Sequence, residues 1–212
     1  IDRANPEALD YLDDVRQLLF EGKYAAGDQL AQQKIMGTRI DGGKHTYQTL
    51  GDLLLDFEGI GEVESYRRSL NLETAVAKTE FKSDGVKYTR EIFASAPDEV
   101  IVLKLSASEK NKLNFTLRME RPGEAESLSV GENRVLMNGF AEHEGRGTRF
   151  ASVASVDAKS GTVQSSENAL VVENADEVII RISGRTDYWG EDEVNTSAND
   201  IKNTSQTSFH VL

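Results

Sequence analysis

A short run of polar and aromatic side chains, His45 to Thr49 (HTYQT), stands directly before an alternating segment in this chain of 212 residues. From Asp52 to Phe57 apolar and acidic residues alternate, which is typical of a strand with one buried face. The run before it has no such period. Histidine, tyrosine and glutamine side chains at the mouth of a strand are consistent with a loop that faces a ligand. They are equally consistent with the ordinary beginning of a strand.

The histidines do not predict a metal site. The chain has three, His45, His143 and His210, and none stands at the HxH or HExxH spacing that binds zinc. The sequence contains no cysteine, which excludes a thiolate site and a disulfide framework. The acidic groups at 13–14 and 191–193 lack the alternating oxygen ligands and central glycine of a calcium loop. We therefore expect neither a metal nor a cofactor.

Motifs for phosphate binding and nucleophilic catalysis are also missing from the sequence. The segment GIGEVESY at 59–66 lacks the lysine and the following helix of a phosphate loop, and no G-x-S-x-G stands anywhere. Glycosidases hold two carboxyl groups about 5 to 10 Å apart. The carboxylates here, such as Glu62, Glu64, Glu80 and Glu91, mostly stand at polar positions of alternating segments. This pattern indicates a solvated sheet face and no self-contained active site.

Composition limits the class of protein and of partner. Hydrophobic residues make up 38% and charged residues 28% of the chain, which favours a globular protein and excludes a disordered one. No apolar run approaches the roughly 18 residues of a membrane-spanning helix. The formal net charge is −12, from 36 acidic and 24 basic residues. Such a surface repels phosphate backbones, so we expect no nucleic-acid partner, whereas neutral ligands such as sugars remain possible.

The helices predicted from the sequence lie at the beginning of the chain. Asn5 is a candidate N-cap before Pro6, and apolar residues recur at spacings of three and four up to Gly22. A second helix is predicted from Tyr24 to Ile35, which gives a helical hairpin. We expect the first forty residues to be the only helical region. The polar and acidic stretch 191–212 is predicted to be a linker.

From Gly51 onward the pattern has the period of strands. Asp84-Gly85 between two alternating runs predicts a tight hairpin, and Pro97-Asp98 predicts a second turn. The continuous apolar run 100–103 is typical of a central strand. Strands are predicted at 51–58, 62–72, 74–82, 86–94, 99–107, 113–120, 133–138, 149–157, 169–173 and 177–183. The chain is thus predicted to be mainly β, with stacked antiparallel sheets behind the helical hairpin.

The order of several longer motifs resembles one known family. The segments YQTLGDLLLDF, YRRSLNLETAVAKTEF, YTREIFASAPDEVIVLKLSA and FTLRMERP follow one another as in the amino-terminal domain of glycoside hydrolase family 95. The opening NPEALDYLDDVRQLLFEGKYAAGDQLAQQKIMG and the later AKSGTVQSSENALVVENADEVIIRISGRTDYW are similar to the beginning and end of the same region. Together these motifs cover most of the chain.

The resemblance implies an antiparallel β-supersandwich that supports a catalytic (α/α)6 barrel on the same polypeptide. Members of the family are best known as inverting α-1,2-L-fucosidases, and some act on α-L-galactosides. Their acid, a glutamate, and the asparagine and aspartate that activate water belong to the barrel. We therefore expect a fragment of a larger protein, with no catalytic residue in this chain. The expected division is a hairpin and loop at 1–44 that belong to the domain, a supersandwich at 45–190, and a linker toward the barrel at 191–212.

The same resemblance suggests a role for the run that precedes the first strand. It implies that His45, Tyr47 and Gln48 shape the interface with the barrel or the rim of a pocket for a fucosylated glycan. The tyrosine ring and the glutamine amide suit sugar hydroxyl groups. The alternative is that these residues cap the strand and pack within their own domain. A periplasmic or secreted location is expected from the resemblance alone.

Three other functions compete with a supporting domain. A free-standing carbohydrate-binding module would need an exposed aromatic platform, for which Tyr47, Tyr188 and Trp189 are the candidates. A complete enzyme similar to the sugar mutarotases, which share the supersandwich architecture, would need histidines and a carboxylate gathered on a concave sheet. A structural or assembly module would associate through unpaired sheet edges. The scattered histidines argue against the second, and Arg90, Glu91 and Asp98 are expected to be structural.

Overall fold

The computed structural model describes residues 5–37, 48–123, 125–129, 131, 133–143, 146–205, 207 and 209. Within them the chain forms two compact units, 1–48 and 49–212, which are described separately. The first unit holds helices α1 (Ala8–Phe20) and α2 (Tyr24–Lys34). No helix among the described residues is long and apolar enough to cross a membrane.

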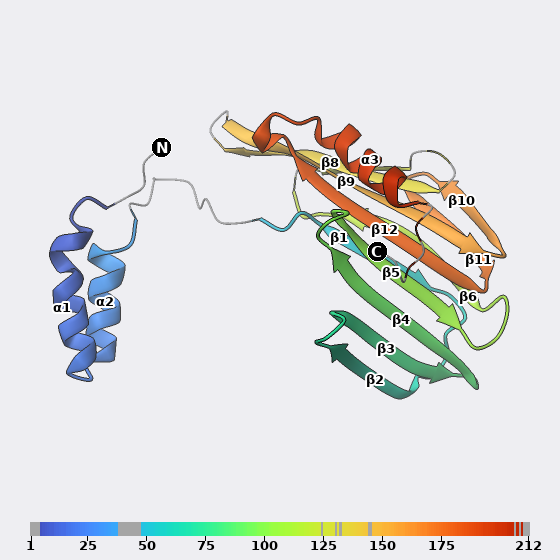
Figure 1. Ribbon diagram of the computed structural model, residues 1–212, viewed down its shortest axis with the longest axis horizontal. Helices are drawn as coiled ribbons and strands as arrows, with labels where there is room; N and C mark the ends of the chain where they lie inside the picture. The colour runs from blue at the N-terminus through green and yellow to red at the C-terminus, as the bar shows by residue number, and fades with distance from the viewer. Residues whose placement is uncertain are drawn as a thin grey trace. The chain divides into compact units, whose positions relative to one another are not determined.

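The second unit is built from two antiparallel sheets and one helix (Figure 1). The smaller sheet has the order β1-β6-β11-β10 and the larger the order β2-β3-β4-β5-β12-β9-β8-β7. The strands are β1 (Asp52–Phe57), β2 (Glu64–Asn71), β3 (Val76–Ser83), β4 (Val86–Ser95), β5 (Val100–Ala107), β6 (Leu113–Glu120), β7 (Ala125–Ser129), β8 (Arg134–His143), β9 (Arg146–Lys159), β10 (Thr162–Ser166), β11 (Ala169–Ala175) and β12 (Glu177–Thr186). A short 3-10 helix, η1 (Asp187–Trp189), and helix α3 (Glu193–Thr204) follow.

The main core lies between the two sheets. Alternate residues of β6 point into it, and Leu113, Phe115 and Leu117 are almost completely buried. Facing them across the sandwich are apolar side chains of the larger sheet, including Leu105 and Ile180. Two antiparallel sheets packed in this way confirm the predicted mainly β, sandwich-like fold.

The turn between β3 and β4 has the geometry that its sequence predicts. Asp84 and Gly85 have φ angles of +50° and +80°. Two successive residues with positive φ make a turn whose twist matches that of the flanking strands, and Asp-Gly is among the sequences best suited to it. The hairpin therefore sets the register of β3 against β4, from Ser83 opposite Val86 onward.

Three features of the fold differ from the sequence expectation. Strands β7 and β10 are not predicted, and both lie at the ends of their sheets, where a short strand needs only one partner. Helix α1 begins at Ala8, after Glu7 and not directly after Asn5; the Asn5 side chain accepts a hydrogen bond from the Glu7 amide in the turn before the helix. The expectation that helices are confined to the first forty residues is wrong, since α3 covers 193–204.

Helix α3 escapes prediction because its sequence is polar and its apolar stripe is narrow. Ile201 is its one large hydrophobic side chain that is fully buried, and Ser197 and Thr204 occupy the other buried positions. Asp192 caps the helix by accepting a hydrogen bond from the Asn195 amide at 3.0 Å. Tertiary contacts with β9 and β12 supply the rest of its stability.

The inter-sheet core generates a first prediction. Leu117→Ala, at a side chain with 0% exposure, should lower the free energy of unfolding by about 2 to 5 kcal/mol, because it leaves a cavity in a packed interior. The matched change Leu72→Ala, at a side chain that is 86% exposed, should alter it by less than about 0.5 kcal/mol. Urea denaturation followed by circular dichroism measures both. Equal effects at the two leucines would contradict the assigned inner face of β6.

Candidate functional site

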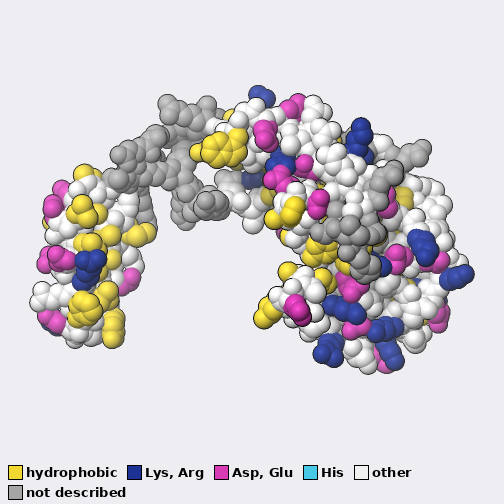
Figure 2. Space-filling view, in the orientation of Figure 1, with side chains coloured by type: hydrophobic (Ala, Val, Ile, Leu, Met, Phe, Trp, Pro, Cys, Tyr) yellow, Lys and Arg dark blue, Asp and Glu magenta, His cyan; other side chains and the backbone are white. Residues whose placement is uncertain are grey.

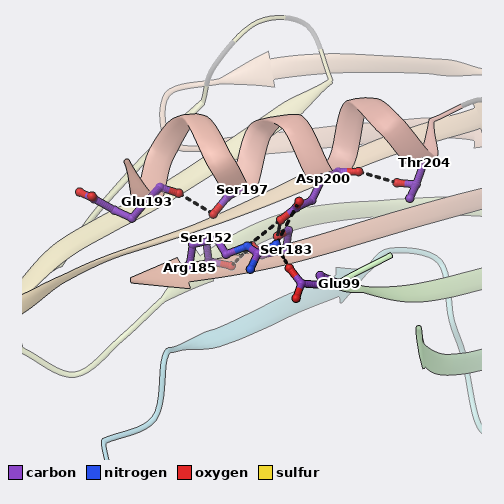
Figure 3. Close-up of polar contacts among 8 residues, drawn as sticks. All are labelled: Glu99, Ser152, Ser183, Arg185, Glu193, Ser197, Asp200 and Thr204. Atoms are coloured by element: carbon purple, nitrogen blue, oxygen red, sulfur yellow. Dashed lines mark hydrogen bonds and ion pairs between the residues drawn. The ribbon is translucent and has the colours of Figure 1, made fainter. Parts of the chain in front are cut away.

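The outer face of the larger sheet carries the densest polar network in the described second unit. Helix α3 lies over β12 and β9, and Asp200 points from it toward the sheet (Figure 3). Its carboxylate accepts hydrogen bonds from Ser183 Oγ at 2.7 Å and from Arg185 Nε at 2.9 Å. Arg185 Nη2 makes a further bond to the second oxygen at 3.2 Å. This two-point contact fixes both the position and the rotation of α3.

Two positively charged residues, Arg181 and Arg185, lie on β12, the strand that α3 packs against. Arg185 also contacts Glu99, and its hydrogen bond with Asp200 raises the pKa of the guanidinium above its usual value. Arg181 is 2% exposed, contacts Asp157 and donates to the Thr207 carbonyl at 3.1 Å. A buried guanidinium needs such partners because removing it from water is costly. The network therefore joins α3 and Thr207 to the sheet.

A second, smaller hydrophobic cluster accompanies the polar contacts. Its members, on β5, on β9, on α3 and beyond it, are Val100, Val102, Val153, Ile201 and Phe209. Phe209 packs edge to face on Phe93 of β4, with ring centroids 5.0 Å apart. The outer face is thus apolar around Ile201 and Phe209.

A cleft of about 640 Å³ opens beside Phe209 on strands β2, β3 and β4. Its walls combine polar and apolar groups; they are Ser69, Asn71, Thr74, Ala75, Val76, Lys78, Glu91, Phe93, Ala94, Ser95, Ala96, Pro97 and Phe209. Basic and acidic side chains lie interspersed over this end of the unit (Figure 2). A concave surface with apolar walls and a few polar groups is the usual form of a small-molecule site.

The charged groups of the cleft are arranged across neighbouring strands. Lys78 of β3 stands opposite Glu91 of β4, with 4.0 Å between Nζ and the carboxylate. Lys78 also approaches Glu80 at 3.3 Å, and hydrogen bonds from Lys87 and then Lys78 lower the pKa of Glu80. The cleft is therefore lined by a positive charge, on Lys78, and a negative charge, on Glu91. Such a surface can donate and accept hydrogen bonds without selecting a strongly charged ligand.

The run that the sequence marks out is only partly within the described residues. His45 and Tyr47 lie outside them, as does His210, and no side chain is described for His143. Gln48 is described and exposed. The proposed role of His45, Tyr47 and Gln48 at an interface or a sugar pocket therefore stays a prediction. Among the described residues no group of three His, Asp or Glu side chains is placed to hold a metal.

Two other residues singled out in the sequence form a surface pair. Tyr188 and Trp189 on η1 are 70% and 85% exposed, and their rings meet edge to face with centroids 4.8 Å apart. Asp187 ties this short helix to β9 by accepting a hydrogen bond from the Arg149 amide at 2.9 Å. The pair is a small exposed aromatic patch. Whether Tyr47 extends it falls outside the described residues.

The three residues expected to be structural make contacts within the second unit. The Arg90 guanidinium lies 4.5 Å from the centre of the Phe57 ring, and burial lowers the pKa of this arginine. Glu91 faces Lys78, and Asp98 accepts a hydrogen bond from Ser95 at 2.5 Å. Sequence reasoning misses that Glu91 also borders the cleft. The sequence feature that could have indicated this is the opposite charge of Lys78 and Glu91, which the hairpin register places across from each other.

Comparison with known proteins gives consistent results. A model described as "Glycosyl hydrolase family 65, N-terminal domain" matches residues 1–191. "Alpha-L-fucosidase 2" of Arabidopsis thaliana is 32% identical over 216 residues, which cover 89% of this chain and 25% of that protein. "Probable alpha-fucosidase A" of Aspergillus oryzae is 28% identical over 157 residues, covering 70% of this chain and 21% of that protein.

A solved structure titled "Putative kojibiose phosphorylase from human microbiome" has a TM-score of 0.49 and 12% identity, and the match covers 74% of this chain and 25% of that one. The chain thus spans about a quarter of the length of the Arabidopsis thaliana relative.

The contact between α3 and β12 generates a second prediction. Asp200→Asn removes the negative charge that Arg185 and Ser183 share, and should lower the free energy of unfolding by about 1.5 to 3 kcal/mol. The matched change Asp56→Asn affects an exposed pair with Arg118 and should cost at most about 1 kcal/mol. Chemical denaturation of both variants measures the difference. A cost at Asp200 no larger than that at Asp56 would show that the network does not hold α3.

Proposed function

The chain belongs to the glycosyl hydrolase family 65 N-terminal domain family, and from this premise we propose that it is the non-catalytic N-terminal domain of a glycan-degrading exo-glycosidase. The parent enzyme is an inverting α-1,2-L-fucosidase. The observation that carries this proposal is the 32% identity to an α-L-fucosidase across 89% of the chain. The catalytic residues then lie in an (α/α)6 barrel on the same polypeptide.

The geometry supports a scaffolding role. The inter-sheet core packs the two sheets of the second unit together, and Asp200 and Arg185 hold α3 on its outer face. A rigid support matters because catalytic groups must be held to a fraction of an ångström. The domain stabilises the barrel and presents a fixed surface to it. His45, Tyr47 and Gln48 contribute to the interface or to the rim of the sugar pocket.

Hydrolysis of 2′-fucosyllactose tests this function. The parent protein should release fucose, and this chain alone should release none under the same conditions, because the acid and the water-activating residues are in the barrel. Proton NMR of the first turnovers should show β-fucose, the product of inversion at an α-linkage. Fucose release by this chain alone would place the catalytic residues within it. Cleavage of an α-L-galactoside in preference to the fucoside would change the substrate.

Substitutions in the parent test the run before the first strand. Gln48→Ala and Tyr47→Ala should lower kcat/KM for 2′-fucosyllactose by about tenfold, the effect of losing roughly 1.4 kcal/mol of transition-state binding. Gln164→Ala, at an exposed position of β10, is the matched control and should leave kcat/KM unchanged. Normal kinetics in both Gln48→Ala and Tyr47→Ala would favour the alternative, in which these residues only begin the strand.

A free-standing carbohydrate-binding module is the second candidate, and the exposed pair of Tyr188 and Trp189 favours it. Aromatic rings of this kind stack against sugar rings. In that case Trp189→Ala should abolish glycan binding by the isolated chain. Unchanged binding in Trp189→Ala would remove this candidate.

A further inference from the structure

We propose that the cleft on strands β2, β3 and β4 is a second, non-catalytic binding site for a neutral oligosaccharide. This inference goes beyond the scaffolding role and depends on the proposed function only for the choice of the sugar probe. The cleft belongs entirely to the second unit, and its walls are described residues. It is separate from the Tyr188 and Trp189 pair, neither of which lines it.

The size of the cleft suits a short glycan. Its volume of about 640 Å³ lies within the range of roughly 300 to 1,000 Å³ for ligand sites in proteins. One wall is the end of β2 and the turn that leads into β3, and the opposite wall is the end of β4 and the turn that follows it. A cleft between two turns is open at the surface. It can therefore take an end or a branch of a longer chain.

The polar groups of the cleft match sugar hydroxyls better than charged ligands. Lys78 and Glu91 bring one positive and one negative charge to the same cleft, 4.0 Å apart. An anion such as phosphate would meet the Glu91 carboxylate and a protein of net charge −12. A hydroxyl group both donates and accepts, so it can bond to the carboxylate and the ammonium at once. The hydroxyl groups of Ser69 and Thr74 add neutral donors and acceptors, and the Asn71 side-chain amide group adds donors.

The apolar groups complete the chemistry of a sugar site. Phe93 lines the cleft and is held edge to face by Phe209. Val76 and Ala94 provide further aliphatic surface. A pyranose ring has a face of C–H groups between its hydroxyls, and such a face packs on aromatic and aliphatic carbon. The cleft therefore offers one surface that packs against the C–H groups of a sugar and another that hydrogen-bonds to its hydroxyl groups.

Hydrogen bonds within the flanking turns hold both walls of the cleft. Asn71 Oδ1 accepts hydrogen bonds from the amides of Glu73 and Thr74, at 2.9 and 3.2 Å, which fixes the turn after β2. At the other wall Ser95 donates to Asp98. A site that is already ordered loses little conformational entropy on binding.

Titration of the isolated chain with 2′-fucosyllactose and with lactose tests the proposal. Isothermal calorimetry should give a Kd of about 1 mM for at least one of these neutral sugars. Amide NMR shifts should concentrate on β3, on β4 and in the turns that flank them. Glu91→Ala and Lys78→Met should each raise Kd at least about fivefold. The matched changes Glu173→Ala and Lys159→Met, at exposed positions outside the cleft, should leave it unchanged.

Several outcomes would overturn the proposal. The first is the absence of binding by the folded wild-type chain. The second is a Kd for Glu91→Ala and for Lys78→Met equal to that of the wild type. The third is loss of binding in Trp189→Ala with the cleft variants unaffected. Circular dichroism and thermal unfolding confirm that each variant is folded. Because the readout is binding by this chain and not hydrolysis, a parent that failed to cleave fucosides would contradict the proposed function and leave this result intact.

Discussion

The packing of the two sheets through their inner faces is the constraint on which the rest of the second unit depends. Side chains alternate along a strand, so each residue buried between the sheets sends its neighbours to the opposite face. Leu103 and Leu105 face the inter-sheet core, which places Val102 and Lys104 outside. The outer face carries the support for α3, its ion pairs and the cleft.

On the outer face, helix α3 both covers apolar residues and pairs with a charged one. Beneath α3 it is apolar around Ile201 and charged around Arg181 and Arg185. Burying those arginines is favourable only while Asp157 and Asp200 pair with them. Helix α3 therefore depends on the sheet for its stability, and Arg185 of the sheet depends in part on Asp200 of α3 for its pairing. Beyond the edge of this cover the same face becomes the open, mixed surface of the cleft.

A scaffolding domain and a secondary glycan site are physically compatible. The scaffolding role needs a rigid core, which the Leu117 region supplies. The binding role needs only an exposed part of the same sheet, near Glu91. Because the two use opposite faces, variation in the cleft residues leaves the core packing intact. In the proposed parent enzyme, such a site would raise the local concentration of substrate.

The sequence by itself determined the strand periodicity, the Asp84-Gly85 hairpin, the helical pair and the likeness to a glycosidase domain. The periodicity, the hairpin and the helices follow from short-range rules, since side-chain alternation and turn stereochemistry act over a few residues. The likeness rests on the order of longer motifs along the chain. Only the tertiary structure decided where α3 forms, because its polar sequence becomes stable through Ile201, Asp200 and their partners on distant strands. It alone also brought Lys78, Glu91, Phe93 and Phe209 around one cleft. Such gathering depends on strand order and register, which join residues far apart in the chain.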